Sequence, residues 1–110
     1  MKIQTLICLV ASLLPTTSFA TVHDVFAHVT EIEPSYVPNN LPFAIDQALG
    51  ACPAGPWLFF NGNSPSNNLP ENVKAIYAEL TVALVTGNQV EVTGDDNGCI
   101  VTNVHLLNHP

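Results

Sequence analysis

The sequence contains no arginine, and lysine occurs only at positions 2 and 74. Aspartate and glutamate together number nine, so the formal net charge at pH 7 is −7 with histidine neutral. Proteins bind nucleic-acid phosphates and anionic lipid surfaces chiefly through lysine and arginine, so this composition argues against both kinds of partner. The acidic composition permits a neutral, polar or cationic ligand. The simpler interpretation is that the negative charge only keeps a small protein soluble.

Long apolar runs are absent outside the first 20 residues. Residues 1–20 begin with Lys2, continue through the mostly apolar segment Ile3–Leu14, which is too short to span a bilayer, and end in Ser18-Phe19-Ala20. A positive start, a short apolar run and small residues before a cleavage point are typical of a secretory signal peptide. We therefore expect residues 21–110 to form a single small secreted or periplasmic domain without integral membrane association.

Motifs of catalysis and metal binding are absent as well. No serine lies in a Gly-x-Ser-x-Gly elbow, no Cys-x-x-Cys pair is present, and the four histidines lack the spacing of a zinc site. We therefore predict that the protein is not an enzyme and holds no metal or cofactor.

Cysteine is scarce, and its few positions are informative. Cys8 lies in the predicted signal peptide, which leaves Cys52 and Cys99 as a pair. An even pair in an exported chain indicates a disulfide. A disulfide between them would close a loop across 47 positions. On the chain-entropy model, closing a loop of that length stabilises the fold by about 4 kcal/mol.

The clearest periodic segment is Asn68–Gly87, which predicts a helix. Asn68 is the expected N-cap, Pro70 and Glu71 suit the first turn, and Gly87 suits the left-handed conformation that ends a helix. The apolar residues that recur at helical spacing on the predicted core face are Val73, Ile76, Tyr77, Leu80 and Leu84.

The opposite face of this helix carries Ala75, Ala78 and Val82, where an exposed helix usually shows charge. Two interpretations stand side by side. The face packs against a second copy of the chain as an oligomer interface, or it reflects only the high helix propensity of alanine.

Short segments rich in β-branched and aromatic residues surround the helix. They predict strands within 22–33, 43–49, 57–60, 89–93 and 99–107. The imperfect alternation in the first segment indicates a bulge or burial on both faces, and residues 43–49 are also compatible with two turns of helix. Residues 34–42 read as a proline-rich loop, and 94–98 as a hairpin turn.

The resulting order of strand, strand, strand, helix, strand, strand predicts a mainly β fold with one helix. It is the connectivity of a five-stranded OB-fold-like barrel, a small Greek-key barrel. The alternative is an open α+β antiparallel sheet with the helix on one face.

Three aromatic residues form a candidate ligand surface. Trp57 and Phe59 are two apart and therefore share one face of a strand. Core packing is the favoured interpretation for Phe59 and Phe60, whereas Tyr36 lies in the proline-rich loop and should be exposed. Trp57 and Tyr36 are thus the candidates for stacking against the apolar face of a sugar.

Part of the second half of the chain resembles a known family. The segment Tyr77–Ala83, the run Thr86-Gly87-Asn88-Gln89-Val90-Glu91-Val92 and Cys99 beyond a turn resemble the helix-to-strand junction of subtilase cytotoxin B-subunit-like proteins. Cys52 near Trp57 resembles the half-cystine before the third strand of that family. The resemblance covers about a quarter of the chain. It implies an OB-type fold, a pentameric ring and binding of host glycans, but it assigns no glycan-contacting residue.

These observations predict a secreted, toxin B-subunit-like binding module for a glycan or another surface ligand, assembled as a homo-oligomer. The alternative is an exported structural or interaction protein, or an inhibitor, without a small-molecule ligand. Under neither interpretation do we expect nucleic acid as a partner.

Overall fold

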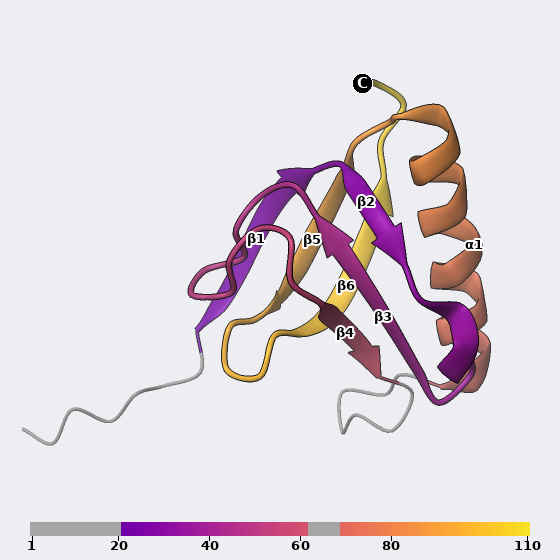
Figure 1. The fold of residues 1–110 in the computed structure, drawn as a ribbon, viewed down its shortest axis with the longest axis horizontal. Helices are drawn as coiled ribbons and strands as arrows, with labels where there is room; N and C mark the ends of the chain where they lie inside the picture. Colours follow the sequence, from indigo (N-terminus) through magenta and orange to yellow (C-terminus); the bar gives the residue numbers. More distant parts are fainter. Residues whose placement is uncertain (1–20, 62–68) are drawn as a thin grey trace, which may run out of the picture.

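A computed structural model describes residues 21–61 and 69–110 (Figure 1). The predicted signal peptide, residues 1–20, lies outside the described residues. The strands are β1 (Val22–Ala27), β2 (Val29–Ile32), β3 (Asn40–Ile45), β4 (Leu58–Asn61), β5 (Val90–Asp95) and β6 (Ile100–Leu106). A 3₁₀ helix, η1 (Pro34–Tyr36), precedes β3, and the α-helix α1 (Pro70–Thr86) precedes β5.

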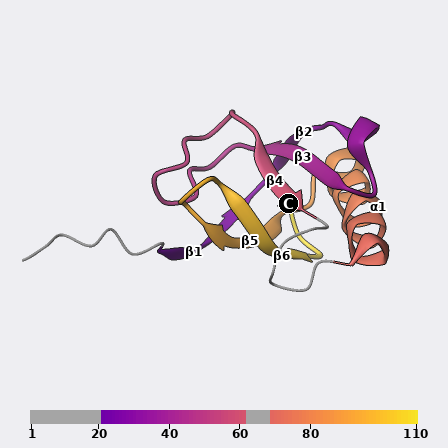
Figure 2. The same ribbon diagram turned by 90° about the horizontal axis from the view of Figure 1, so that it is seen from below.

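The six strands form one mixed sheet in the order β1-β5-β6-β4-β3-β2. Neighbouring strands are antiparallel except β4 and β6, which run parallel. The two edge strands, β1 and β2, are consecutive in the chain and separated only by His28, so the sheet curls back on itself. Figure 2 shows β2, β3 and β4 as one layer above β1, β5 and β6.

The predicted five-stranded closed barrel is therefore wrong. The sheet has six strands and two edges, and in the described residues no strand ladder joins β1 to β2. The open α+β sheet that was the alternative is the fold observed, with one parallel pair in place of a fully antiparallel sheet.

The sixth strand arises because the predicted first strand, 22–33, is divided at His28. The backbone N–H of His28 donates to Asp46 Oδ1 at 2.7 Å, and the Asp46 N–H donates to the His28 carbonyl oxygen at 3.1 Å. A register shift between Val29 and Glu31 follows immediately. The irregular alternation of this segment thus reflects a bend that sends its two halves to opposite edges.

The boundaries of β3 and β4 differ from the predicted ones. β3 begins at Asn40, inside the predicted loop, and ends at Ile45, before the predicted end at Leu49. Pro42 is accommodated because it faces β2 where that strand ends, and its carbonyl accepts a hydrogen bond from Glu33 N–H at 2.9 Å. β4 begins one residue later than predicted, so Trp57 precedes the strand.

The predicted helix is confirmed, with small corrections at its start and on its core face. Asn68 lies outside the described residues, and Leu69 is the N-cap, without a side-chain cap. Gly87 ends the helix in the left-handed conformation, with φ 74°, and its N–H donates to the Ala83 carbonyl. The predicted core position of Leu84 is wrong, since Leu84 is exposed and the neighbouring Ala83 is buried.

The hydrophobic core lies between the inward faces of the sheet and α1. The helix stands at one end of the curled sheet and contacts β2, β3 and β6 (Figure 1). The largest fully buried side chains are Leu41, Phe43, Ile45, Leu49, Leu58, Val73, Leu80, Val90, Val92 and Val101. Near the end of the chain, the His109 carbonyl accepts a hydrogen bond from Gln89 N–H at 2.9 Å.

Candidate ligand-binding site

A groove of about 630 Å³ lies on the outward side of β3 and β4, beside the loop that leads into β3. Its aromatic lining residues are Tyr36, Trp57 and Phe59. The remaining lining residues are Glu33, Ser35, Val37, Asn39, Asn40 and Pro42. They come from η1 and its flanking residues, from β3, and from β4 and the residue before it.

The register of the β3–β4 ladder explains why these residues meet. Pro42 lies opposite Phe59, and Phe43 lies opposite Leu58. Because successive residues of a strand face opposite sides, Phe43 and Leu58 enter the core while Pro42 and Phe59 face outward. The segment 33–39 then lies beside this outward face and forms the second wall of the groove.

Both predicted stacking residues lie in this groove. Tyr36 is 61% exposed, as its position in a proline-rich loop predicts, and Trp57 is 40% exposed. Phe60 is buried in the core as predicted, but the core assignment of Phe59 is wrong, since that side chain lines the groove. Alternation places Phe59 and Phe60 on opposite faces, and only the position of the core decides which of the two is buried.

Two polar groups of the groove were not anticipated. Glu33 is the N-cap of η1, and its Oε1 accepts a hydrogen bond from Ser35 N–H at 2.9 Å. Hydrogen bonds from Ser35, first from its side chain and then from its backbone, lower the pKa of Glu33 below its ordinary value. The Oδ1 atom of Asn40 is buried and has no hydrogen-bond partner among the described residues. The groove thus presents an anionic carboxylate beside its aromatic faces.

The sequence contained one local signal for Glu33. A carboxylate directly before a proline is placed to cap a short helix, as Glu33 does ahead of Pro34. Asn40 carried no such signal, because its place in the groove depends on pairing with Asn61 of β4.

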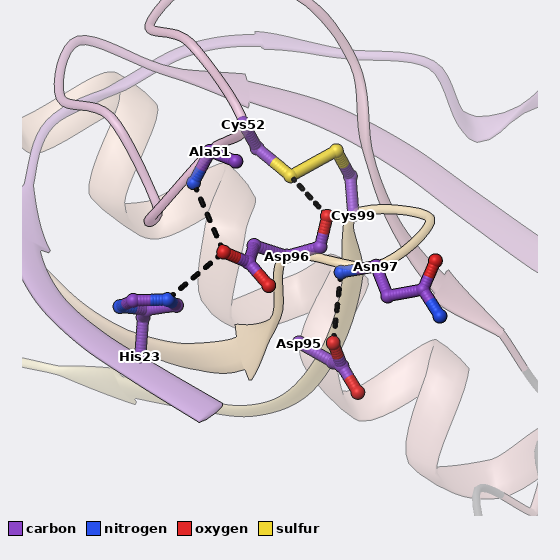
Figure 3. Close-up of a disulfide and its surroundings, with 7 residues drawn as sticks. All are labelled: His23, Ala51, Cys52, Asp95, Asp96, Asn97 and Cys99. Atoms are coloured by element: carbon purple, nitrogen blue, oxygen red, sulfur yellow. Dashed lines mark hydrogen bonds and ion pairs between the residues drawn. A yellow bond between two sulfur atoms is a disulfide. The ribbon is translucent and has the colours of Figure 1, made fainter. Parts of the chain in front are cut away.

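The predicted disulfide between Cys52 and Cys99 is confirmed, and it belongs to a separate structural cluster (Figure 3). It joins the segment after β3 to the turn between β5 and β6, across 47 positions of sequence. Asp96 in that turn receives a hydrogen bond from Ala51 N–H at 3.2 Å, and its Oδ2 lies 3.0 Å from His23 Nε2. This cluster ties three distant segments together and is not part of the groove.

Three histidines of the described residues, His23, His28 and His105, pair with carboxylates. His28 Nδ1 lies 3.0 Å from Asp46 Oδ2, and His105 Nδ1 lies 3.5 Å from Glu91 Oε1. Within residues 21–61 and 69–110, no group of three or more metal-ligating side chains is close enough to hold an ion.

The predicted oligomer face of α1 is exposed. Ala75, Ala78 and Val82 all face away from the sheet, and Val85 extends the same stripe by one turn. Val82 is 46% exposed and Val85 is 80% exposed. In the part of the chain that the structure describes, no helix combines the length and the hydropathy needed to cross a bilayer.

No protein-family model, curated protein or solved structure matches this chain. The resemblance to subtilase cytotoxin B-subunit-like proteins therefore stays a prediction.

Proposed function

We propose that this protein is a secreted carbohydrate-binding module whose ligand lies in the groove of Tyr36, Trp57 and Phe59. The observation that carries the proposal is the convergence of three aromatic side chains from two separate segments, Tyr36 from η1 and Trp57 and Phe59 from β4 and the residue before it, in one open cavity of about 630 Å³. Ligand sites are typically concave and mostly apolar, with a few polar groups that fix orientation. Aromatic faces suit the apolar face of a pyranose, and the groups on Glu33, Asn39 and Asn40 suit its hydroxyls.

The position of the groove supports the same conclusion. A helix between β4 and β5, and a parallel pairing of β4 with β6, agree with an OB-type connectivity in a partly open form, with β1 and β2 as the two halves of its first strand. OB-folds bind oligonucleotides and oligosaccharides on their second and third strands and the loop before them. Those elements correspond here to β3, β4 and residues 33–39, which line the groove.

Charge favours a saccharide over a nucleic acid among these ligands. None of the described residues that line the groove is lysine, arginine or histidine, and the chain as a whole has no arginine. Binding of a phosphate backbone depends on such cations, and a carboxylate in the groove opposes it.

Export is part of the proposal. The Cys52–Cys99 disulfide is of a kind that persists in oxidising compartments such as the periplasm or the extracellular space.

A second candidate function, that of a homo-oligomeric interaction subunit, is favoured by the outer face of α1. Four aliphatic residues, Ala75, Ala78, Val82 and Val85, form a continuous exposed stripe. An exposed apolar surface of this kind is typical of a protein interface. We propose a second copy of the chain as its occupant, because small side chains allow two helices to approach closely.

The carbohydrate proposal is tested with purified protein on a glycan array, followed by titration of the hits. Trp57 is the only tryptophan of the chain, so its fluorescence reports on the groove directly. We expect a saturable change in emission with at least one array hit. An array without hits, together with unchanged emission across the sugar panel, would exclude the carbohydrate function and leave the interaction subunit.

A further inference from the structure

The negative charge of the groove indicates which class of sugar binds there. Glu33 is the only carboxylate among the described lining residues, and no cationic side chain accompanies it there. One of its oxygens accepts the Ser35 N–H, and the residue lines the groove. The groove is therefore locally anionic at neutral pH.

An ionised carboxylate accepts hydrogen bonds and donates none, so Glu33 would pair with a ligand that brings N–H donors. An ammonium group offers three hydrogen-bond donors and no acceptor, whereas the carboxylate of an acidic ligand offers no donor.

The aromatic residues of the groove and the net negative charge of the chain also favour a cationic ligand. A cation close to the face of a tryptophan, tyrosine or phenylalanine ring is attracted by the ring quadrupole. The chain carries a formal charge of −7, and Lys74 is the only base after residue 20. This field attracts cationic ligands and repels anionic ones.

Resting on the proposed carbohydrate function, we infer that the groove selects amine-bearing sugars, with the ammonium group paired to Glu33 and the pyranose ring against Trp57. N-acetylated sugars bind more weakly because they lack the positive charge. Sialylated sugars bind weakest because their carboxylate faces Glu33.

The test compares three probes of similar size at 0.15 M salt: a glucosamine tetramer, an N-acetylglucosamine tetramer and 3′-sialyllactose. Binding is measured by isothermal titration calorimetry and by Trp57 emission. We expect the glucosamine tetramer to bind about fivefold more tightly than its N-acetylated counterpart, from the ion pair between its ammonium group and Glu33. We expect no binding of sialyllactose.

Two variants separate a specific contact from general attraction to an acidic protein. Glu33→Gln should abolish the preference for the free amine while keeping an acceptor for Ser35 N–H. Glu31→Gln removes the same charge from an exposed residue outside the groove and should keep the preference. Circular dichroism establishes that both variants are folded.

Equal binding of the two tetramers to the unmodified protein overturns the inference and leaves the carbohydrate function intact. A preference that Glu33→Gln and Glu31→Gln reduce equally also overturns it, because the attraction is then non-specific. Absence of binding by every probe, together with an empty glycan array, overturns the proposed function as well.

Discussion

Pro42 of β3 and Phe59 of β4 lie opposite each other in the antiparallel ladder, and both side chains line the groove. Pro42 is buried and Phe59 is half-buried, so this pair forms a floor that is packed against its surroundings. Trp57 and Tyr36, in contrast, are exposed. The groove therefore combines a floor that contributes to stability with walls that are free to contact a ligand.

Trp57→Ala should weaken sugar binding by about tenfold, because a tryptophan at a binding surface commonly contributes more than 1 kcal/mol. Its effect on stability should be small, since the side chain is 40% exposed. Calorimetry with the best glycan-array hit measures the first effect, and urea denaturation measures the second. Phe26→Ala is the matched control, because Phe26 is an exposed aromatic residue of β1 outside the groove. Equal losses of affinity in the two variants would contradict the assignment.

Replacing both cysteines, Cys52→Ala with Cys99→Ala, should lower the free energy of unfolding by about 2–5 kcal/mol. The bridge closes a loop across 47 positions, and a loop of that length gives about 4 kcal/mol on the chain-entropy model. Urea denaturation gives the magnitude, and peptide mapping of the non-reduced protein should yield one linked pair. Two alkylatable thiols in the exported protein would be incompatible with the bridge.

Acid should destabilise the cluster around Asp96. The Ala51 N–H is the largest cause that lowers the pKa of Asp96 below its ordinary value of 3.8; burial opposes it, and His23 adds to the lowering. Since the unfolded state then binds the proton more readily, the contribution of this carboxylate is complete above the unfolded pKa. It is lost as pH falls through the lower folded pKa.

Asp96→Asn should therefore reduce stability at pH 7 and make its decline below about pH 5 less steep. The measurement is the urea midpoint as a function of pH. Asp24→Asn, which removes the same charge from an exposed residue of β1, should leave the shape of the curve unchanged. Superimposable profiles for Asp96→Asn and the unmodified protein would show that the carboxylate contributes nothing.

Val82→Glu should dissociate the proposed homo-oligomer into folded monomers, because it buries a charge in the helix interface. Static light scattering at micromolar concentration measures the mass. The unmodified protein should associate more tightly at 1 M salt, where the Debye length falls to about 3 Å and repulsion between acidic copies is screened. Val22→Glu places the same charge on exposed β1, away from α1, and should not alter assembly. A monomeric unmodified protein in both low and high salt would rule out the interface.

Features encoded by neighbouring residues were predictable from the sequence. Gly87 ends α1 as expected, because the left-handed conformation at a helix end is a local property of glycine. The turn between β5 and β6, with Gly98 at φ 82°, follows in the same way from its Asn-Gly pair. The Cys52–Cys99 pairing needed only a count of two remaining cysteines.

Features fixed by distant pairing were not predictable. Asn40 and Leu41 read as loop because of the prolines around them, and they become strand only because Asn61 and Phe60 pair with them. Likewise, the alternation of side chains along a strand does not show whether Phe59 or Phe60 faces the core. The aromatic candidates Tyr36 and Trp57 could be proposed individually, but their common groove depends on the β3–β4 register.

The division of the first strand at His28 also has a consequence for the order in which the chain folds. β2 pairs with β3, which follows it within the same short stretch of chain, so this hairpin can form early. β1 pairs with β5 from Val22↔Asp95 to Ala27↔Val90, so each of its partners lies more than 60 residues further along the chain. Non-local pairings of this kind fold slowly because a long loop must close first. His28 therefore separates β2, which pairs with residues close to it in the chain, from β1, which can pair only when β5 of the β5–β6 hairpin is in place.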